Sequence, residues 1–321
     1  MMIIVTSAML LVVGTLLLIG AATYLLKGLI GVSAHFAVPT FILSMLVISI
    51  DLEVFAPAVV GAYNDLTELS YGSILGTVVF LICLALGVAA FLYPLQQVAF
   101  PVRYVGLLGG ALVSNVLFGL DGQINRLEGA VCIILYGAYL MYLIRDVRRT
   151  RSIQRGLAEG AAEVEDIRDK PLYVSVLAVV GGLIFLVAGG LAVVAGIGNL
   201  LLFWGISETI MGVTVLAIAA NSVELVEAVI PAQKDMGEVV VGNIVGSAVF
   251  QVLFTTGFVA LVRPVQVEPV AFQVAMPAAL LSWLVLLVLV AQQRVSRLIG
   301  GTLVLAYILF VGVSVVLGLA L

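Results

Sequence analysis

Four carboxylates lie in stretches that are otherwise apolar enough to cross a membrane: Asp51, Glu53, Glu224 and Glu227. A charge at the centre of a bilayer costs at least about 2.5–3.5 kcal/mol on insertion scales, so such residues face a wet cavity or a bound ion. Hard cations such as calcium prefer oxygen ligands and take about 6–8 of them. The four acids therefore predict a shared cation site near the bilayer midplane.

Hydroxyl and amide side chains around the acids can supply the neutral oxygens of such a site. We expect Glu53 and Glu224 to be the charged ligands, with Asp51 and Glu227 as secondary candidates. A soft-metal site is not expected because there is no cluster of His and Cys, and the single histidine, His35, is interpreted as a residue at the headgroup level. The neutral candidates are Ser49, Ser73, Thr77, Asn221, Ser222, Asn243, Ser247 and Gln251.

Helical spacing distinguishes the two pairs of acids. Glu224 and Glu227 are three residues apart and share one face of a regular helix. Asp51 and Glu53 point about 200° apart on the 3.6-residue period, so both reach one cavity only where the helix is broken. The prolines downstream of the two pairs could break the helices and free carbonyls for the ion: Pro57 and Pro231.

The composition predicts an all-α membrane protein. The chain is 63% hydrophobic and 10% charged, whereas soluble proteins carry about 25% charged residues. A spanning helix needs about 20 apolar residues, and the first run, Met1 to Leu26, is interpreted as a retained helix because it lacks the basic start and cleavage site of a signal peptide. Ten transmembrane helices are predicted, at residues 3–25, 34–62, 70–94, 100–119, 125–145, 172–195, 202–230, 239–262, 269–291 and 299–320.

One long polar segment divides the chain into residues 1–145 and 172–321, each with five predicted spans. Residues 146–171 have too few apolar side chains for a core and are predicted to be a linker. If this linker is cytoplasmic, 12 of the 14 Lys and Arg residues lie inside and only Arg126 and Arg263 outside, as the positive-inside rule requires. Both termini are then outside, and related halves with five spans each form two inverted repeats.

A decapeptide repeats between the halves. Residues 71–80 read YGSILGTVVF and residues 241–250 read VGNIVGSAVF, with five identities and a hydroxyl at both Thr77 and Ser247. The alternative is a coincidence of small-residue helix packing, but both copies follow an acidic span at the same place in their half. The decapeptides therefore favour an internal duplication.

The acidic spans before these decapeptides align less closely. Glu224 lies 18 residues before Gly242, and Glu53 lies 19 before Gly72. One extra residue in the first connecting loop would bring Glu53 opposite Glu224. The duplication then predicts one glutamate from each half in the site.

Residues 205–257 resemble the second repeat of prokaryotic members of the sodium/calcium exchanger superfamily of calcium/cation antiporters. This stretch begins GISETIMGVT and contains VELVEA and GNIVGSAVF, where the family shows G-I-S-E-T-x-x-G-x-T, then T-S-L-P-E and G-N-I-V-G-S-N. The ten-span layout and the central linker fit as well, so the resemblance covers nearly the whole chain. The first repeat is degenerate.

The resemblance implies roles for individual residues. Glu224 matches the ion-binding glutamate and Ser247 the serine of the second repeat, while Glu53 and Thr77 match the glutamate and serine of the first. The chain departs from the family pattern at several positions: Asn221 stands for a serine, Ala220 for a threonine, Gln251 for an aspartate, Leu81 for an asparagine, and Ser49 and Ile50 for a threonine–serine pair.

The resemblance implies a secondary antiporter that exports calcium, or a similar divalent cation, in exchange for sodium. Asn221, Glu224 and Gln251 also resemble the G-N-x-x-E pattern and glutamine of proton-coupled calcium exchangers, so proton coupling is the alternative, and a cation channel or passive sensor on the same fold a more distant one. We expect no enzymatic activity and no cofactor, only transported Ca2+ with Na+ or H+. The expected partners are inorganic cations and a lipid bilayer, with no nucleic acid; the oligomeric state is left open, a monomer included, and a prokaryotic plasma membrane is the expected location.

Overall fold

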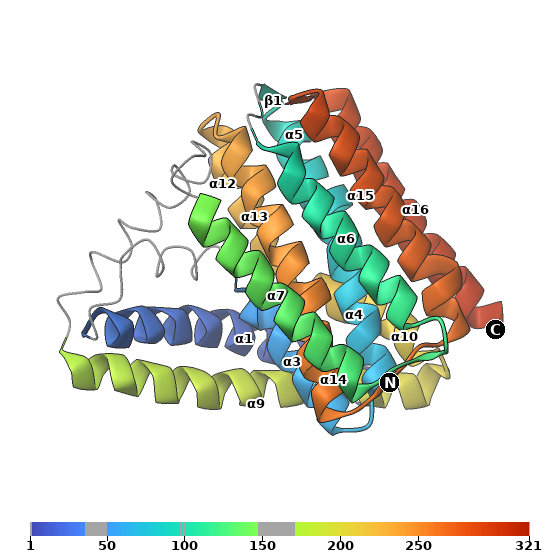
Figure 1. The fold of residues 1–321 in the computed structure, drawn as a ribbon. Helices are drawn as coiled ribbons and strands as arrows, with labels where there is room; N and C mark the ends of the chain where they lie inside the picture. The colour runs from blue at the N-terminus through green and yellow to red at the C-terminus, as the bar shows by residue number, and fades with distance from the viewer. Residues whose placement is uncertain (1, 36–49, 97, 99, 147–170, 321) are drawn as a thin grey trace.

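The computed structural model describes residues 2–35, 50–96, 98, 100–146 and 171–320, which are almost entirely helical (Figure 1). Among them, seven helices are long and apolar enough to cross a membrane, or eight if one bent pair counts as a single span. The helix α6 (Val102–Phe118) is shorter, and residues 36–49 of the predicted second span lie outside the described residues. The prediction of a helical membrane protein is confirmed, whereas the count of ten spans stays a prediction.

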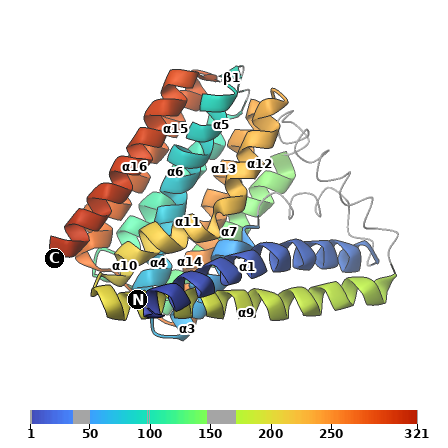
Figure 2. The same cartoon turned by 180° about the vertical axis from the view of Figure 1, so that it is seen from behind.

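The two longest helices lie side by side across the rest of the molecule, as Figures 1 and 2 both show: α1 (Met2–His35) and α9 (Leu172–Trp204). Their backbones approach closely at glycines, since a Cβ on Gly189 would lie 3.0 Å from the Gly14 carbonyl oxygen. The predicted span 3–25 agrees with the apolar stretch Ile4–Leu25, whereas the span predicted to end at residue 195 continues to Leu201, and both helices extend further. Hydropathy marks the apolar part of a helix, but α9 continues until Gly205 ends it with a φ of +62°.

The remaining helices form a bundle around two interrupted central helices. Each central helix contains a π-helical turn. In its most apolar stretch of 18 residues, 83% is buried inside the protein, against 22–39% in the other spans. The first is α4 (Thr67–Val79), η1 (Phe80–Ala85) and α5 (Leu86–Leu92), and the second is α13 (Gly237–Val249), η4 (Phe250–Thr255) and α14 (Thr256–Val262). Around them lie α3 (Leu52–Tyr63), α6, α7 (Arg126–Asp146), α10 (Glu208–Met211), η3 (Gly212–Leu216), α11 (Ala217–Ala220), α12 (Ser222–Gln233), η5 (Ala271–Ala275), α15 (Met276–Ala291) and α16 (Arg297–Ala320).

Two small antiparallel sheets join residues before the linker to residues after it. β1 (Leu95–Gln96) pairs with β4 (Arg294–Val295), and β2 (Gln123–Ile124) pairs with β3 (Val265–Gln266). β1 precedes α6 and β2 follows it, so the sheets lie at opposite ends of this helix. The bundle is therefore tied together at both ends.

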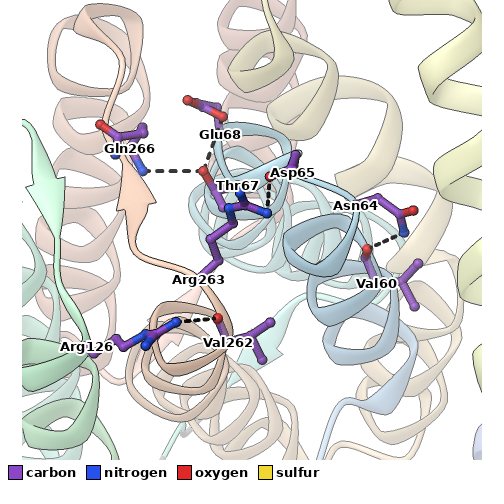
Figure 3. Close-up of polar contacts among 9 residues, drawn as sticks. All are labelled: Val60, Asn64, Asp65, Thr67, Glu68, Arg126, Val262, Arg263 and Gln266. Carbon is purple, nitrogen blue, oxygen red and sulfur yellow. Dashed lines mark hydrogen bonds and ion pairs between the residues drawn. The ribbon is translucent and has the colours of Figure 1, made fainter.

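Side-chain contacts reinforce the end that carries β2 and β3 (Figure 3). Arg263 forms an ion pair with Asp65 in the turn between α3 and α4. Arg126 Nη2 donates to the carbonyl of Val262 at 3.4 Å, and the backbone N–H of Gln266 donates to a side chain of α4. The two basic residues that the sequence assigns to the outside thus lie at one end of the bundle.

The two halves share structural landmarks at a constant separation of 170 residues. Asp51 is the N-cap of α3 and Asn221 the N-cap of α12, and both helices contain 12 residues. Asp65 and Asp235 have φ values of +69° and +55° in the following turns. The next helices, α4 and α13, both contain 13 residues and lead into π-helical turns.

The predicted extra residue in the first connecting loop is therefore wrong. With equal loops, the counterpart of Glu224 is Val54 and the counterpart of Glu53 is Val223. The prediction aligned the two halves by matching one glutamate with another. The equivalent helix caps and turns align them instead at a separation of 170 residues. The two halves thus place their acids at different positions.

The second acidic helix is broken ahead of its acids. Residues Glu208–Ala220 and Ser222–Gln233 are bent by 52° at Asn221. Pro57 and Pro231 lie inside α3 and α12, so the expectation that these prolines unwind the helices is wrong. Proline lacks an N–H, so each of these residues removes only the one backbone hydrogen bond to the carbonyl four residues earlier. The other backbone hydrogen bonds of the helix remain.

Candidate cation site

Asp51 lies at the start of α3 and points its carboxylate into the protein. The side chain caps the helix, because the N–H of Val54 donates to Asp51 Oδ1 at 3.2 Å. Only 3% of Asp51 is exposed, and Oδ2 is buried without a hydrogen-bond partner. One oxygen therefore holds the helix terminus and the other remains available to a ligand.

Gln251 brings the second central helix to this same point. It is the second residue of the π-helical turn η4, and its Nε2 donates to the backbone carbonyl of Asp51 at 3.3 Å. The side chain is completely buried, and its Oε1 has no partner. Gln251 thus adds a neutral acceptor oxygen beside the Asp51 helix terminus.

Asn221 occupies the corresponding break in the other half. Its Nδ2 donates to Thr77 Oγ1 at 2.8 Å and to the Ala217 carbonyl at 2.6 Å. Its Oδ1 is buried and has no partner. Both N-cap residues therefore present one unsatisfied oxygen each in the interior of the bundle.

Glu224 is the buried carboxylate of α12. It is 7% exposed, and it accepts hydrogen bonds from Ser247 Oγ and Asn243 Nδ2, both at 3.2 Å. Glu227 lies on the same side of α12, as its spacing predicts, but it is exposed and shares the Asn243 amide at 3.1 Å. Glu224 therefore faces the interior of the protein, and Glu227 is exposed at its surface.

Glu53 is half-buried, next to the more deeply buried Asp51. Its carboxyl lies within hydrogen-bonding reach of the Asp51 carboxyl, and Glu227 is close enough to interact with it electrostatically. The resemblance ranks Glu53 above Asp51, whereas the structure gives Asp51 the deeper position and the unpartnered oxygen. The sequence signal for this was the N-cap preference of Asp at a helix break.

The neutral candidates divide into two groups. Thr77 and Ser247 are buried and bonded to Asn221 and Glu224. Ser73 and Ser222 instead donate to carbonyls of their own helices, and Ser49 lies outside the described residues. Hydrogen bonds join the site residues in three groups: Thr77 with Asn221, Glu224 with Asn243 and Ser247, and Asp51 with Gln251.

The three unpartnered side-chain atoms of this cluster are all acceptors: Asp51 Oδ2, Asn221 Oδ1 and Gln251 Oε1. A buried acceptor without a donor costs about 1–3 kcal/mol, and more in a membrane. Within the described part of the chain, no three His, Cys, Asp or Glu side chains are close enough to hold a metal ion. The donor set fits a hard cation that is bound by carboxylates together with amide and hydroxyl oxygens.

Comparison with known proteins agrees with this chemistry. The family model described as "Sodium/calcium exchanger protein" matches residues 6–145 and 174–316. The inner membrane protein YrbG of Escherichia coli is 29% identical over 273 residues, covering 82% of each chain. The protein CaxA of Alkalimonas amylolytica is 25% identical over 308 residues, covering 92% of this chain and 94% of its own.

A solved structure shows the same fold. The sodium-calcium exchanger NCX_Mj, soaked with Na+ and Sr2+, matches 96% of this chain and 98% of its own with a TM-score of 0.59 at 20% identity. The family model covers both halves and the whole bundle that surrounds the buried oxygens. Exchangers of this family are transporters rather than enzymes, and the chain belongs to the sodium/calcium exchanger family.

Proposed function

We propose that the protein exports calcium, or a similar divalent cation, in exchange for sodium. The observation that carries the proposal is the set of three buried, unpartnered acceptor oxygens on Asp51, Asn221 and Gln251. With Glu224, the set contains two buried carboxylates, whose charge balances that of a divalent ion when both are ionised. The family match supports exchange, and the name of YrbG supports a bacterial inner membrane.

We further propose that the two halves are inverted repeats, with both termini outside and residues 146–171 in the cytoplasm. The constant separation of 170 residues between equivalent caps and turns supports a duplication. The positions of Arg126 and Arg263 at one end of the bundle support the orientation. Residues 147–170 of the linker lie outside the described residues, so its cytoplasmic position stays a prediction from charge.

Alternating access would come from the movement of α1 and α9 across the bundle. These helices pack on each other through glycines, and they meet the bundle through a separate apolar cluster that includes Leu18, Leu52 and Leu69. The small sheets tie the other helices together at both ends. A sliding pair on a tied bundle can expose the cation to one side at a time.

Proton coupling is the second candidate, and the substituted residues favour it. Gln251 and Leu81 stand where the family has an acidic and a neutral ligand, and Ala220 and Ile50 lack hydroxyls that the resemblance connects in part with sodium. A carboxylate that releases calcium can bind a proton in its place. Asp51 and Glu224 would then carry the counter-ion themselves.

Calcium uptake into proteoliposomes distinguishes these functions. One set of vesicles receives an outward sodium gradient and another an outward proton gradient, with the membrane potential clamped. Uptake driven by sodium supports the proposal, and uptake driven only by protons replaces sodium with the second candidate. Flux that needs no counter-ion gradient would show a channel, and no calcium flux under any condition would refute the substrate.

A further inference from the structure

The π-helical turn η4 carries Gln251, and its backbone hydrogen bonds depart from the regular helical pattern. A π-helical turn shifts the backbone bonds from i→i+4 to i→i+5, so carbonyls within it are poorly matched to the regular helix. Val252 and Gln251 are both completely buried. The backbone N–H of Thr256 donates to the Gln251 carbonyl, five residues earlier, and the Val252 carbonyl lies in the same shifted stretch.

Asn115 of α6 donates a side-chain hydrogen bond to this stretch. Its Nδ2 donates to the Val252 carbonyl at 2.9 Å, and it also approaches the Ala111 carbonyl at 3.4 Å. On its other side, Asn115 Oδ1 accepts from the hydroxyl of Tyr71 at 3.4 Å. Asn115 and Tyr71 are 2% and 1% exposed, so this chain of hydrogen bonds is sealed from solvent.

The bonded carbonyl lies one residue beyond Gln251. Thr256 Oγ1 donates to the Gln251 carbonyl at 3.3 Å, and Gln251 Nε2 donates to the Asp51 carbonyl. Two successive carbonyls of η4, those of Gln251 and Val252, thus each accept a hydrogen bond from a side chain outside the turn. In the first half, Leu81 and Leu86 stand at the positions of Gln251 and Thr256 and have no polar atom to offer.

We infer that Asn115 is a positioning residue for the cation site: it holds η4 through the Val252 carbonyl so that Gln251 Oε1 faces the bound ion. Asn115 itself does not touch the ion. The inference rests on the proposed function, because it needs the oxygens near Gln251 to bind the transported cation. It predicts that Asn115 acts on ion affinity only through Gln251.

A double-mutant cycle tests this coupling. Asn115→Leu, which removes the hydrogen bonds of the amide at similar size, should raise the KM for calcium uptake about tenfold, as the loss of a group that orients a metal ligand does. Gln251→Ala should raise KM as well, and adding Asn115→Leu to Gln251→Ala should change it little further. Tyr71→Phe should give a smaller rise, because its bond acts one step further away.

Two controls separate positioning from general stability. Ser282→Ala removes a buried hydroxyl of α15 that bonds only within its own helix, and it should leave KM unchanged. Asn115→Asp keeps the size, and its buried carboxyl can donate to the Val252 carbonyl when protonated, so it should lie closer to the wild type than Asn115→Leu. Equal KM shifts from Asn115→Leu with and without Gln251 would overturn the inference, as would no shift at all.

Hydrogen exchange of the purified protein gives a readout that needs no transport. The amides of residues 250–256 should exchange faster in Asn115→Leu than in the wild type, and those of the first π-helical turn, residues 80–85, should not change. Unchanged exchange in residues 250–256 would overturn the inference even if transport is altered. If the wild type transports no calcium, the proposed function fails, and a change of exchange would then support only the contact between Asn115 and η4.

Discussion

The amide of Asn221 donates from Nδ2 to Thr77 Oγ1 at 2.8 Å and joins two parts of the chain that are 144 residues apart. Asn221 lies at the break between α11 and α12, and Thr77 lies near the end of α4. Both side chains are completely buried. The bond commits the nitrogen of the amide to Thr77 and leaves Oδ1 as the acceptor that has no partner.

Replacing Thr77 should therefore disturb both the fold and the site. Thr77→Val keeps the shape but leaves the Asn221 amide without this acceptor, which should lower the free energy of unfolding by about 1–3 kcal/mol. Thr77→Ser keeps the hydroxyl and should stay much closer to the wild type. Thermal unfolding in detergent, with and without calcium, measures the difference. Equal behaviour of the two variants would show that the hydrogen bond has no role.

Glu224 and Glu227 form a matched pair for testing the site. Glu224→Gln removes a buried charge that already has two donors, and it should reduce calcium exchange by about 30-fold or more while the protein still folds. Glu227→Gln alters an exposed residue of the same helix face and should have a much smaller effect. Proteoliposome uptake with equal amounts of folded protein checks this. Normal flux in Glu224→Gln would exclude Glu224 as a ligand.

The structure and the family resemblance rank the two acids at the start of α3, Asp51 and Glu53, in opposite orders. Asp51 has the deeper position and an unpartnered Oδ2, so Asp51→Asn should weaken calcium binding more than Glu53→Gln. Because Asp51→Asn keeps an acceptor for the Val54 N–H, the helix cap should survive. Calcium-dependent stabilisation against heat reports binding without transport. A larger loss in Glu53→Gln would make Glu53 the ligand, as the family resemblance implies.

The sequence predicted the membrane class and the region of the site because those depend on strong local signals. Long apolar runs specify membrane helices, and acids within them are rare enough to mark function. The glycine-spaced decapeptides, which indicated a duplication, lie in the two central helices, the most buried spans of the described chain. These features need no knowledge of how helices meet in three dimensions.

Helix ends and the register of α3 could not be obtained in this way. The ends of α1 and α9 depend on packing between them and on the left-handed Gly205, which hydropathy does not measure. The register of the acids depends on which residue caps the broken helix, and Asp51 and Asn221 were recognised as caps only from the backbone. The contact of Asn115 with η4 joins residues 137 positions apart, and one sequence contains no signal for such a pair.

Gly72 and Gly242 are the same position of the repeated decapeptide but have different neighbours. A Cβ on Gly72 would lie 2.3 Å from the carbonyl oxygen of Thr209, so α4 touches the backbone of α10 at this point. A Cβ on Gly242 would meet only the ring of Phe100, at 3.4 Å. The repeat is therefore symmetric in sequence and asymmetric in packing.

Alanine at the two positions should separate these environments. Gly72→Ala must push α4 and α10 apart, which should cost about 1–3 kcal/mol of stability or more because backbone cannot move aside as a side chain can. Gly242→Ala places its methyl group in ordinary contact and should be close to neutral, or slightly stabilising since alanine favours a helix over glycine. Thermal unfolding of the two variants side by side measures the contrast. Equal destabilisation would mean that helix flexibility, rather than the approach of α10, explains why glycine occupies both sites.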